Sequence, residues 1–160
     1  MENKKVSVWL MAAGGAAAAV LAFFFLVMLP IEAVNVKHYY PELAYLFWPL
    51  LISLWIIGAC YALSMLRYFQ ICLRIGKNQS FCRENAKDLG RIALYLGLAG
   101  ALCLVWDAAA AAQSAVSVGI WCLYPFLAAM ASFGLAVLAW GLGKLLARAV
   151  ALKEENDLTV

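Results

Sequence analysis

The chain has 160 residues, of which 67% are hydrophobic and only 13% are charged. A soluble domain has about 45–50% apolar and about 25% charged residues, and one of this size could not bury so much apolar surface. The composition therefore predicts an integral membrane protein and excludes a disordered chain, a disulfide scaffold and a collagen-like chain. The net charge of +3 says little as a total, but its distribution along the chain is informative.

Four apolar stretches are long enough to cross a bilayer, since about 20 helical residues span the hydrocarbon core. They cover residues 6–29, 43–66, 92–112 and 119–146. The first follows Lys4 and Lys5 as a signal peptide would, but its apolar run exceeds the usual limit of about 15 residues. We therefore expect a retained span. The predicted fold is all-α: a polytopic four-helix bundle that forms one domain over residues 1–160.

The positions of Lys and Arg indicate the orientation of the spans, because cytoplasmic loops are enriched in these residues. Of the twelve, only Lys37 lies in the 31–42 loop, and none lies in the 107–118 loop. The other eleven lie near the N-terminus, in the 67–91 loop or at the C-terminal end. Both termini and the middle loop are therefore predicted to be cytoplasmic.

Small residues recur at four-residue spacing on every predicted span, which lets helices approach closely in lipid. The rows are Gly14, Ala18 and Ala22; Gly58 and Ala62; Ala93, Gly97 and Ala101; and Ala139, Gly143 and Ala147. We expect these rows to pack the four helices against one another. The alternative is that one row forms a homodimer or contacts a spanning partner in a larger membrane complex.

The second, third and fourth helices are expected to extend beyond the membrane. Residues 61–75 contain no helix breaker, and Gly76 is a natural C-cap residue. A turn follows, and a new helix is expected to begin near Ser80–Cys82, with Ser80 as its N-cap, and to continue into the third span. The fourth helix should run to about Glu155, which leaves a cytoplasmic tail over residues 147–160.

Charged residues form stripes on the helix that follows the turn. Arg83, Lys87 and Arg91 recur every four residues, and Glu84 and Asp88 form an adjacent acidic stripe within pairing reach. The simplest interpretation is a positively charged loop beside anionic lipid. The functional interpretation is a docking surface for a cytoplasmic protein. Direct nucleic-acid binding is not expected, because the patch is small and lacks interleaved stacking aromatics.

Two motifs resemble those of a known family. Residues 76–89, GKNQSFCRENAKDL, look like a loop motif G-x-P-F-S-x-E-N-x-x-x-L, and residues 152–160 are similar to an acidic end L-K-E-E-N-D-L-T followed by Ile or Val. Both motifs belong to the family called domain of unknown function 2975. Ser80 and Cys82 depart from it, since the family favours proline and serine there. The resemblance, which extends over the whole chain, implies a four-span bacterial membrane protein of undefined activity that is often encoded beside a small Cro-type helix-turn-helix regulator.

The sequence contains no motif for a metal, a cofactor or catalysis. The five cysteines form no C-x-x-C pair, and His38 is the one histidine. The polar residues of the 31–42 loop match no acid–base or metal motif; they are Glu32, His38, Tyr39 and Glu42. A glutathione-using membrane transferase stays as an alternative, because Arg83, Glu84 and Asn85 offer anion-binding chemistry.

Asp107 is the one acid near a predicted span. It lies about 24 Å beyond Arg91 along a helix, so we expect it at the outer interface. The alternative is that it faces the bundle as an ion-binding or substrate-binding group.

These observations favour a non-enzymatic regulatory membrane protein whose loop and tail bind a soluble cytoplasmic regulator. The family resemblance implies that this regulator is a small helix-turn-helix protein. The candidate contact residues are Phe81, Arg83, Glu84, Asn85, Leu89, Glu155, Asn156 and Leu158. The alternative function is a small-molecule transporter or sensor with a ligand cavity inside the bundle near Asp107. No cofactor is expected, and the expected surroundings are the lipids of a bacterial cytoplasmic membrane.

Overall fold

The computed structural model describes residues 2–28, 30–31, 34–35, 38, 45, 47–112 and 118–158. Over these residues the long elements are all helical, and no strand occurs. They are α1 (Glu2–Phe23), a π-helical turn η1 (Phe24–Met28), α3 (Phe47–Gly76), α4 (Arg83–Ala112) and α5 (Val118–Leu158). Four of these segments are long and apolar enough to cross a membrane. The predicted all-α class is therefore confirmed.

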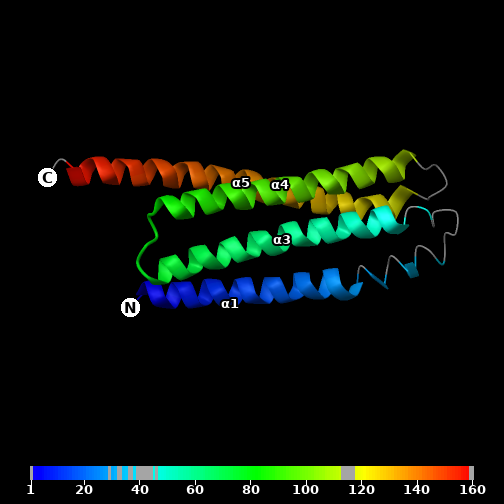
Figure 1. Cartoon of the computed structure of the whole chain (residues 1–160), viewed down its shortest axis with the longest axis horizontal. Helices are drawn as coiled ribbons and strands as arrows, with labels where there is room; N and C mark the ends of the chain where they lie inside the picture. Colours follow the sequence, from blue (N-terminus) through cyan, green and yellow to red (C-terminus); the bar gives the residue numbers. More distant parts are fainter. Residues whose placement is uncertain are drawn as a thin grey trace.

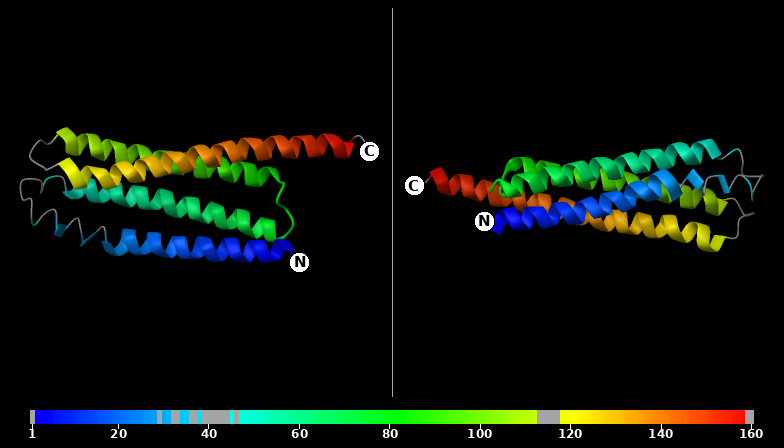
Figure 2. Two further views of the ribbon diagram at one scale, coloured as in Figure 1. Left: turned by 180° about the vertical axis from the view of Figure 1, so that it is seen from behind. Right: turned by 90° about the horizontal axis from the view of Figure 1, so that it is seen from below.

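The four long helices lie side by side and run up and down along one axis (Figure 1). Both termini lie at the same end, and the end of α5 projects past the other helices (Figures 1 and 2). Among the described residues, backbones of the long helices approach closely only between successive helices, most extensively between α4 and α5. Tyr61 of α3 nevertheless reaches across the middle of the molecule, where its hydroxyl shares a hydrogen bond with that of Ser132 on α5.

The buried residues between α3, α4 and α5 are mostly small. One cluster contains Ile57, Cys60, Ala99, Cys103 and Ala129, and a second contains Ile92, Ala93, Leu96, Ala136 and Ala139. Large apolar side chains lie on the outside instead, as Trp9, Leu94 and Val137 do. This distribution is expected in lipid, because helices there associate through close packing rather than through burial of apolar surface from water.

Two side chains join α1 to α3 near the end of the molecule that carries both termini. The Ser7 hydroxyl donates to the Cys72 carbonyl at 2.7 Å, and the Tyr68 hydroxyl donates to the Leu10 carbonyl at 3.0 Å. Gly14 lies directly against the Tyr68 ring, so a larger residue there would collide with it. The predicted row of small residues on the first helix is therefore used, at Gly14, for packing inside the chain.

The connection between α3 and α4 confirms one boundary and corrects two capping predictions. α3 ends at Gly76 as predicted, but the left-handed residue is Asn78, with φ 60°. The Gln79 amide donates to the Arg74 carbonyl at 2.9 Å in a Schellman-type cap. Gly76 instead allows close approach to Ser7, whose hydroxyl would lie 2.9 Å from an added Cβ.

The predicted Ser80 N-cap is wrong, because α4 begins at Arg83 and Cys82 therefore precedes its first residue. The helix after the turn does continue into the third span, since α4 is unbroken from Arg83 to Ala112. α5 likewise runs past Glu155 to Leu158, and it contains Pro125. The predicted start of the second span at residues 43–46 lies largely outside the described residues, and α3 begins at Phe47.

Candidate functional site

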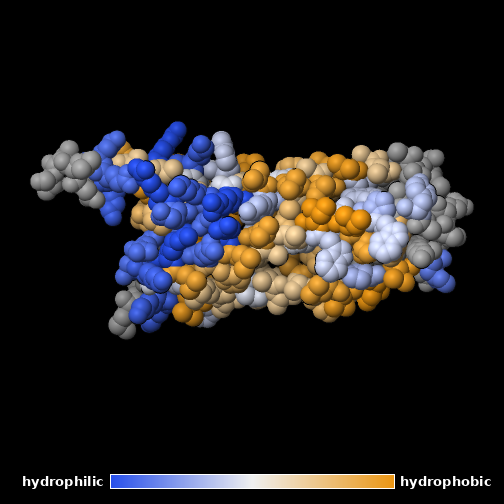
Figure 3. All heavy atoms as spheres, in the orientation of Figure 1, coloured by the Kyte–Doolittle hydropathy of each residue, from blue (hydrophilic) through white to orange (hydrophobic). Residues whose placement is uncertain are grey.

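Hydrophilic side chains gather at the end of the molecule that carries both termini, and apolar side chains cover most of the middle (Figure 3). We call this the charged end; it contains the end of α3, the start of α4 and the last turns of α5. The loop and tail motifs, which are about 70 residues apart in sequence, therefore lie together. Most of the candidate contact residues belong to this region.

Asp88 is the centre of an ionic network between α3 and α4, which we call the Asp88 cluster (Asp88, Arg67, Arg74 and Arg91). Arg74 Nη1 lies 2.6 Å from one carboxylate oxygen of Asp88. Arg91 Nη1 and Arg67 Nη1 lie 3.2 and 3.6 Å from the other. The predicted pairing of Asp88 with Arg91 is confirmed. Asp88 is only 2% exposed, however, which the charge pattern did not reveal. The reason is that α3 covers this face of α4 and brings two arginines with it.

Asn85 lies one turn before Asp88 and is 1% exposed. Its side-chain carbonyl accepts a hydrogen bond from Arg74 Nη1 at 3.1 Å, and its amide donates to the carbonyls of Gln79 and Ser80 at 3.2 and 3.0 Å. Through these hydrogen bonds the Asn85 side chain holds the loop between α3 and α4 against the start of α4. Asn85 is therefore a positioning residue inside the chain and does not offer the contact surface that the sequence suggested.

Arg83, the first residue of α4, forms a bidentate ion pair with Glu154 near the end of α5. Its Nε donates at 3.1 Å and its Nη2 at 2.5 Å to the two carboxylate oxygens. The two side chains are 66% and 47% exposed. We call this pair the clasp. Because exposed ion pairs contribute only about 0–1 kcal/mol, the clasp can open and exchange partners at little cost.

Beside the clasp lies a hollow of about 510 Å³ between α4 and α5, which we call the α4–α5 groove. Its floor consists of small residues: Ala86, Gly90, Gly143, Ala147 and Ala151. Its rim carries Arg83, Lys87 and Lys144, and Lys144 Nζ lies 5.8 Å from the ring centroid of Trp140. A floor of small residues with a cationic rim suits an acidic segment or helix of another molecule, because small residues permit close backbone approach and cations attract carboxylates.

The remaining candidate residues differ in their surroundings. Phe81 is 64% exposed in the loop, and Glu84 is exposed on α4. Leu89 is half-buried, and its Cβ would lie 3.2 Å from a Cβ added to Gly143. Glu155 and Asn156 are exposed on the last turns of α5, whereas the side chain of Leu158 lies outside the described residues.

The sequence reasoning missed Trp140 and Lys144 as site residues. A signal was present, because these two residues are four apart and flank Gly143 of the small-residue row, so they share one face of α5. What could not be read from the sequence was that this face lies opposite Lys87 of α4.

Asp107 lies far from the charged end, on α4 beyond Cys103. Both of its carboxylate oxygens are buried, and neither has a hydrogen-bond partner among the residues that the structure describes. The neighbouring Trp106 indole donates to the Ser53 hydroxyl of α3. In the described part of the chain no three His, Cys, Asp or Glu residues lie close enough to hold a metal ion. Of the predicted outer-loop residues, Glu32, Tyr39 and Glu42 lie outside the described residues.

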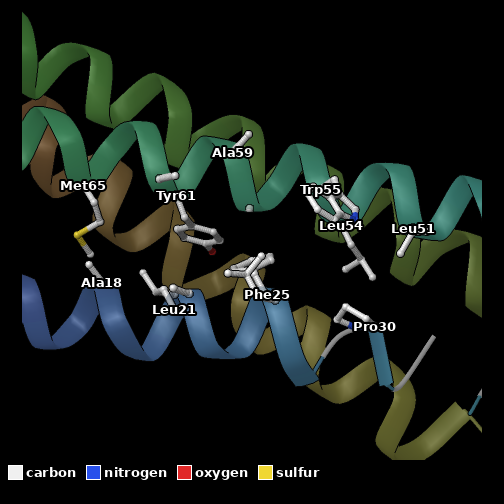
Figure 4. A pocket seen from close by; sticks show the side chains of 14 residues that line it. Ala18, Leu21, Phe25, Pro30, Leu51, Leu54, Trp55, Ala59, Tyr61 and Met65 are labelled. Carbon is white, nitrogen blue, oxygen red and sulfur yellow. The ribbon is translucent and has the colours of Figure 1, made fainter. Parts of the chain in front are cut away.

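An apolar groove of about 490 Å³ runs between α1 and α3, which we call the α1–α3 groove (Figure 4). The small-residue rows of the two helices line it, since Ala18 and Ala22 face Gly58 and Ala62. Phe25 and Trp55 also line it. Asp107 is not among its lining residues, so this groove does not lie where the sequence placed a ligand cavity.

Four long apolar helices, with hydrophilic side chains gathered at the end that carries both termini, define a multi-pass, all-α membrane protein. A family model described as "Protein of unknown function (DUF2975)" matches residues 31–160. The chain therefore belongs to this family, as its loop and tail motifs predicted. The match begins after α1, so the family region comprises α3, α4 and α5 with their connections rather than the whole chain. No curated protein and no solved structure matches the chain significantly.

Proposed function

We propose that the protein is a non-enzymatic regulatory membrane protein that holds a cytoplasmic protein at the bilayer through the α4–α5 groove. The observation that carries the proposal is the clasp, because Arg83 and Glu154 close one side of a groove whose other rim residues are cationic. Around the clasp lie Phe81, Glu84 and the acidic end of α5, all of them exposed. A partner could therefore contact the loop and the tail together.

The proposal requires the charged end to face the cytoplasm of a bacterial cell, with both termini inside. Eleven of the twelve Lys and Arg residues lie in segments on this side, which supports the orientation. In this orientation the end of α3, the start of α4 and the end of α5 project from the cytoplasmic membrane. The α4–α5 groove is then open to soluble proteins.

The chemistry of the groove indicates what the partner must present. Arg83, Lys87 and Lys144 favour carboxylates, and the floor of glycine and alanine admits a helix at close range. The partner is therefore an acidic or amphipathic helix of a soluble protein. A small helix-turn-helix regulator, as the family resemblance implies, can supply such a helix on the side opposite its DNA-recognition helix.

The clasp suggests how binding is controlled. While Glu154 pairs with Arg83, one cationic position of the groove is occupied by the chain's own tail. A carboxylate of the partner can replace Glu154, since an exposed pair is worth only about 0–1 kcal/mol. Any signal that shifts the helices between clasped and unclasped states changes the affinity for the partner by population shift.

The test is a charge reversal in the groove. The double variant Lys87→Glu with Lys144→Glu is expected to lower recovery of a co-purifying helix-turn-helix protein by about tenfold or more, because like charges then face the partner's carboxylates. The measurement is cross-linking of the tagged protein in native membranes, followed by affinity purification and quantitative mass spectrometry.

A matched control changes the same charge outside the groove. Lys77 and Lys153 are exposed at the charged end but do not line the groove, so Lys77→Glu with Lys153→Glu should leave recovery near the wild-type value. Equal recovery from both double variants, or no regulator from the wild type, would contradict the proposal.

A second candidate function is that of a sensor or transporter of a small apolar molecule. The α1–α3 groove favours it, because its volume of about 490 Å³ falls within the range of ligand pockets, about 300–1,000 Å³. A ligand in this groove should raise the unfolding temperature of the purified protein. Ala62→Leu, which fills the groove, should abolish that rise, and Asp107→Asn should leave it unchanged. The opposite pattern would move the ligand site to Asp107.

A further inference from the structure

We infer that the Asp88 cluster binds the phosphate of an anionic phospholipid where α3 and α4 enter the charged end. The cluster combines three guanidinium groups with one carboxylate, so three positive charges and one negative charge leave a net charge of +2. A phosphate oxygen is the natural ligand for such an excess, because guanidinium groups bind phosphate through paired hydrogen bonds.

The three arginines are not equivalent. Arg74 Nη1 contacts both Asp88 at 2.6 Å and the Asn85 carbonyl at 3.1 Å, so two side chains hold this guanidinium group, although the Arg74 side chain is 27% exposed. Arg67 and Arg91 share the other oxygen of Asp88 at 3.6 and 3.2 Å. Their side chains are 30% and 51% exposed, whereas that of Asp88 is 3% exposed. The carboxylate is therefore buried beneath guanidinium groups that remain partly exposed, Arg91 most of all.

The guanidinium groups of Arg67 and Arg91 have N–H donors that remain free to bind a ligand. A guanidinium has five N–H donors, and one carboxylate oxygen shared by Arg67 and Arg91 cannot saturate both groups. Arg67 also donates to the Gln70 side chain at 3.0 Å. Because Arg67 Nη1 and Arg91 Nη1 lie within 3.6 Å of the same Asp88 oxygen, the two guanidinium groups are neighbours, and one phosphate can contact both arginines. Asp88 acts as the positioning residue that holds them together.

The surface next to the arginines identifies the ligand as a lipid rather than a soluble phosphate. Leu63 lies one helical turn from Arg67 on α3, on the side of the apolar band, and is 42% exposed. Leu94 and Leu98 follow Arg91 at three and seven residues, on the same face of α4, and are 67% and 50% exposed. A phosphate on the arginines would place its acyl chains against these leucines.

This site is separate from the α4–α5 groove. The Asp88 carboxylate lies on the face of α4 that meets α3, whereas the groove lies between α4 and α5. Arg91 lies one turn beyond Lys87, but neither it nor any other member of the Asp88 cluster lines the groove. The two basic surfaces can therefore be tested independently, and lipid binding does not depend on the proposed partner.

The experiment measures lipid retention by the whole protein in mild detergent, using native mass spectrometry after incubation with phosphatidylglycerol or phosphatidylcholine. The wild type should retain phosphatidylglycerol preferentially. Arg67→Gln with Arg91→Gln should lower this retention by more than about tenfold, because each lost charge-assisted hydrogen bond corresponds to about tenfold or more. Arg74 remains unchanged in this variant, so Asp88 keeps its closest partner.

The control removes the same charge from the other basic surface. Lys87→Gln with Lys144→Gln should leave phosphatidylglycerol retention near the wild-type value. Equal losses in both double variants would overturn the inference, because retention would then follow net charge alone. Equal retention of phosphatidylcholine by the wild type would overturn it too. Displacement of the lipid by inorganic phosphate at millimolar concentration would assign the site to a soluble phosphate instead.

A second measurement uses only the wild-type chain, in case the arginine variant does not fold. Added phosphatidylglycerol should raise the unfolding temperature more than phosphatidylcholine does, and the difference should persist at about 0.15 M salt, because a partly buried pair is screened less than exposed charges. No difference between the two lipids would overturn the inference.

Discussion

Replacing Asp88 by asparagine is expected to destabilise the protein by about 2–3 kcal/mol, because three arginines then lose the carboxylate that they share. The loss falls below the largest values for broken buried pairs, since the guanidinium groups are partly exposed and can be solvated. For a chain of this length the unfolding temperature should fall by about 5–10 °C. Thermal unfolding in detergent micelles measures the change.

Glu84→Gln provides the matched control for this prediction. Glu84 lies one turn before Asp88 on the same helix, but it is exposed. Removing its charge should leave the unfolding temperature nearly unchanged, as exposed charges contribute about 0–1 kcal/mol. If Asp88→Asn were as harmless as Glu84→Gln, the ionic network would not hold α3 to α4.

Replacing Gly143 by leucine should separate α4 from α5 and destabilise the protein by about 1–3 kcal/mol or more, through overpacking. A Cβ at this position would lie 3.2 Å from both the Ala86 carbonyl oxygen and the Leu89 Cβ. The neighbouring backbone oxygen cannot move away without shifting the helix, so the change should appear as a lower unfolding temperature.

Gly141 allows a direct comparison on the same helix. A Cβ added there meets nothing within 4 Å. Gly141→Leu should therefore be neutral or stabilising by about 0.5–1 kcal/mol, because glycine is a poor helix former. Equal destabilisation by both substitutions would mean that the contact between α4 and α5 is not as close as described.

Much of the architecture follows from local properties of the sequence. Apolar runs set the number of long helices, and the end of α3 at Gly76 follows from a glycine after the unbroken helical pattern of residues 61–75. The prediction failed in detail at the caps, where Asn78 takes the left-handed position and Cys82 precedes α4. Several polar residues of the 76–82 turn can serve as caps, and the contact with Ser7 of α1 occupies Gly76.

The candidate site could be located from the sequence, but the sequence did not predict which of its residues are buried and which are exposed. The loop and tail motifs lie together as expected, joined by Arg83 and Glu154. Asn85 and Asp88 have the same polarity as Glu84, yet they are buried and it is exposed. Which face of α4 is covered depends on where α3 lies, and charge spacing along one helix contains no information on its neighbours.

The sequence by itself determined that this protein resides in a lipid membrane. It also determined the number and approximate length of the apolar helices and the family to which the chain belongs. These properties depend on composition, on hydrophobic runs and on short motifs, all of which are local. Only the tertiary structure decided that Asp88 pairs with three arginines and that Lys87 and Lys144 both line the α4–α5 groove. The same holds for the small-residue rows of α1 and α3, which face each other across the α1–α3 groove. The physical reason is that helices in lipid associate through close packing and specific polar contacts, which depend on the rotation of each helix relative to its neighbours.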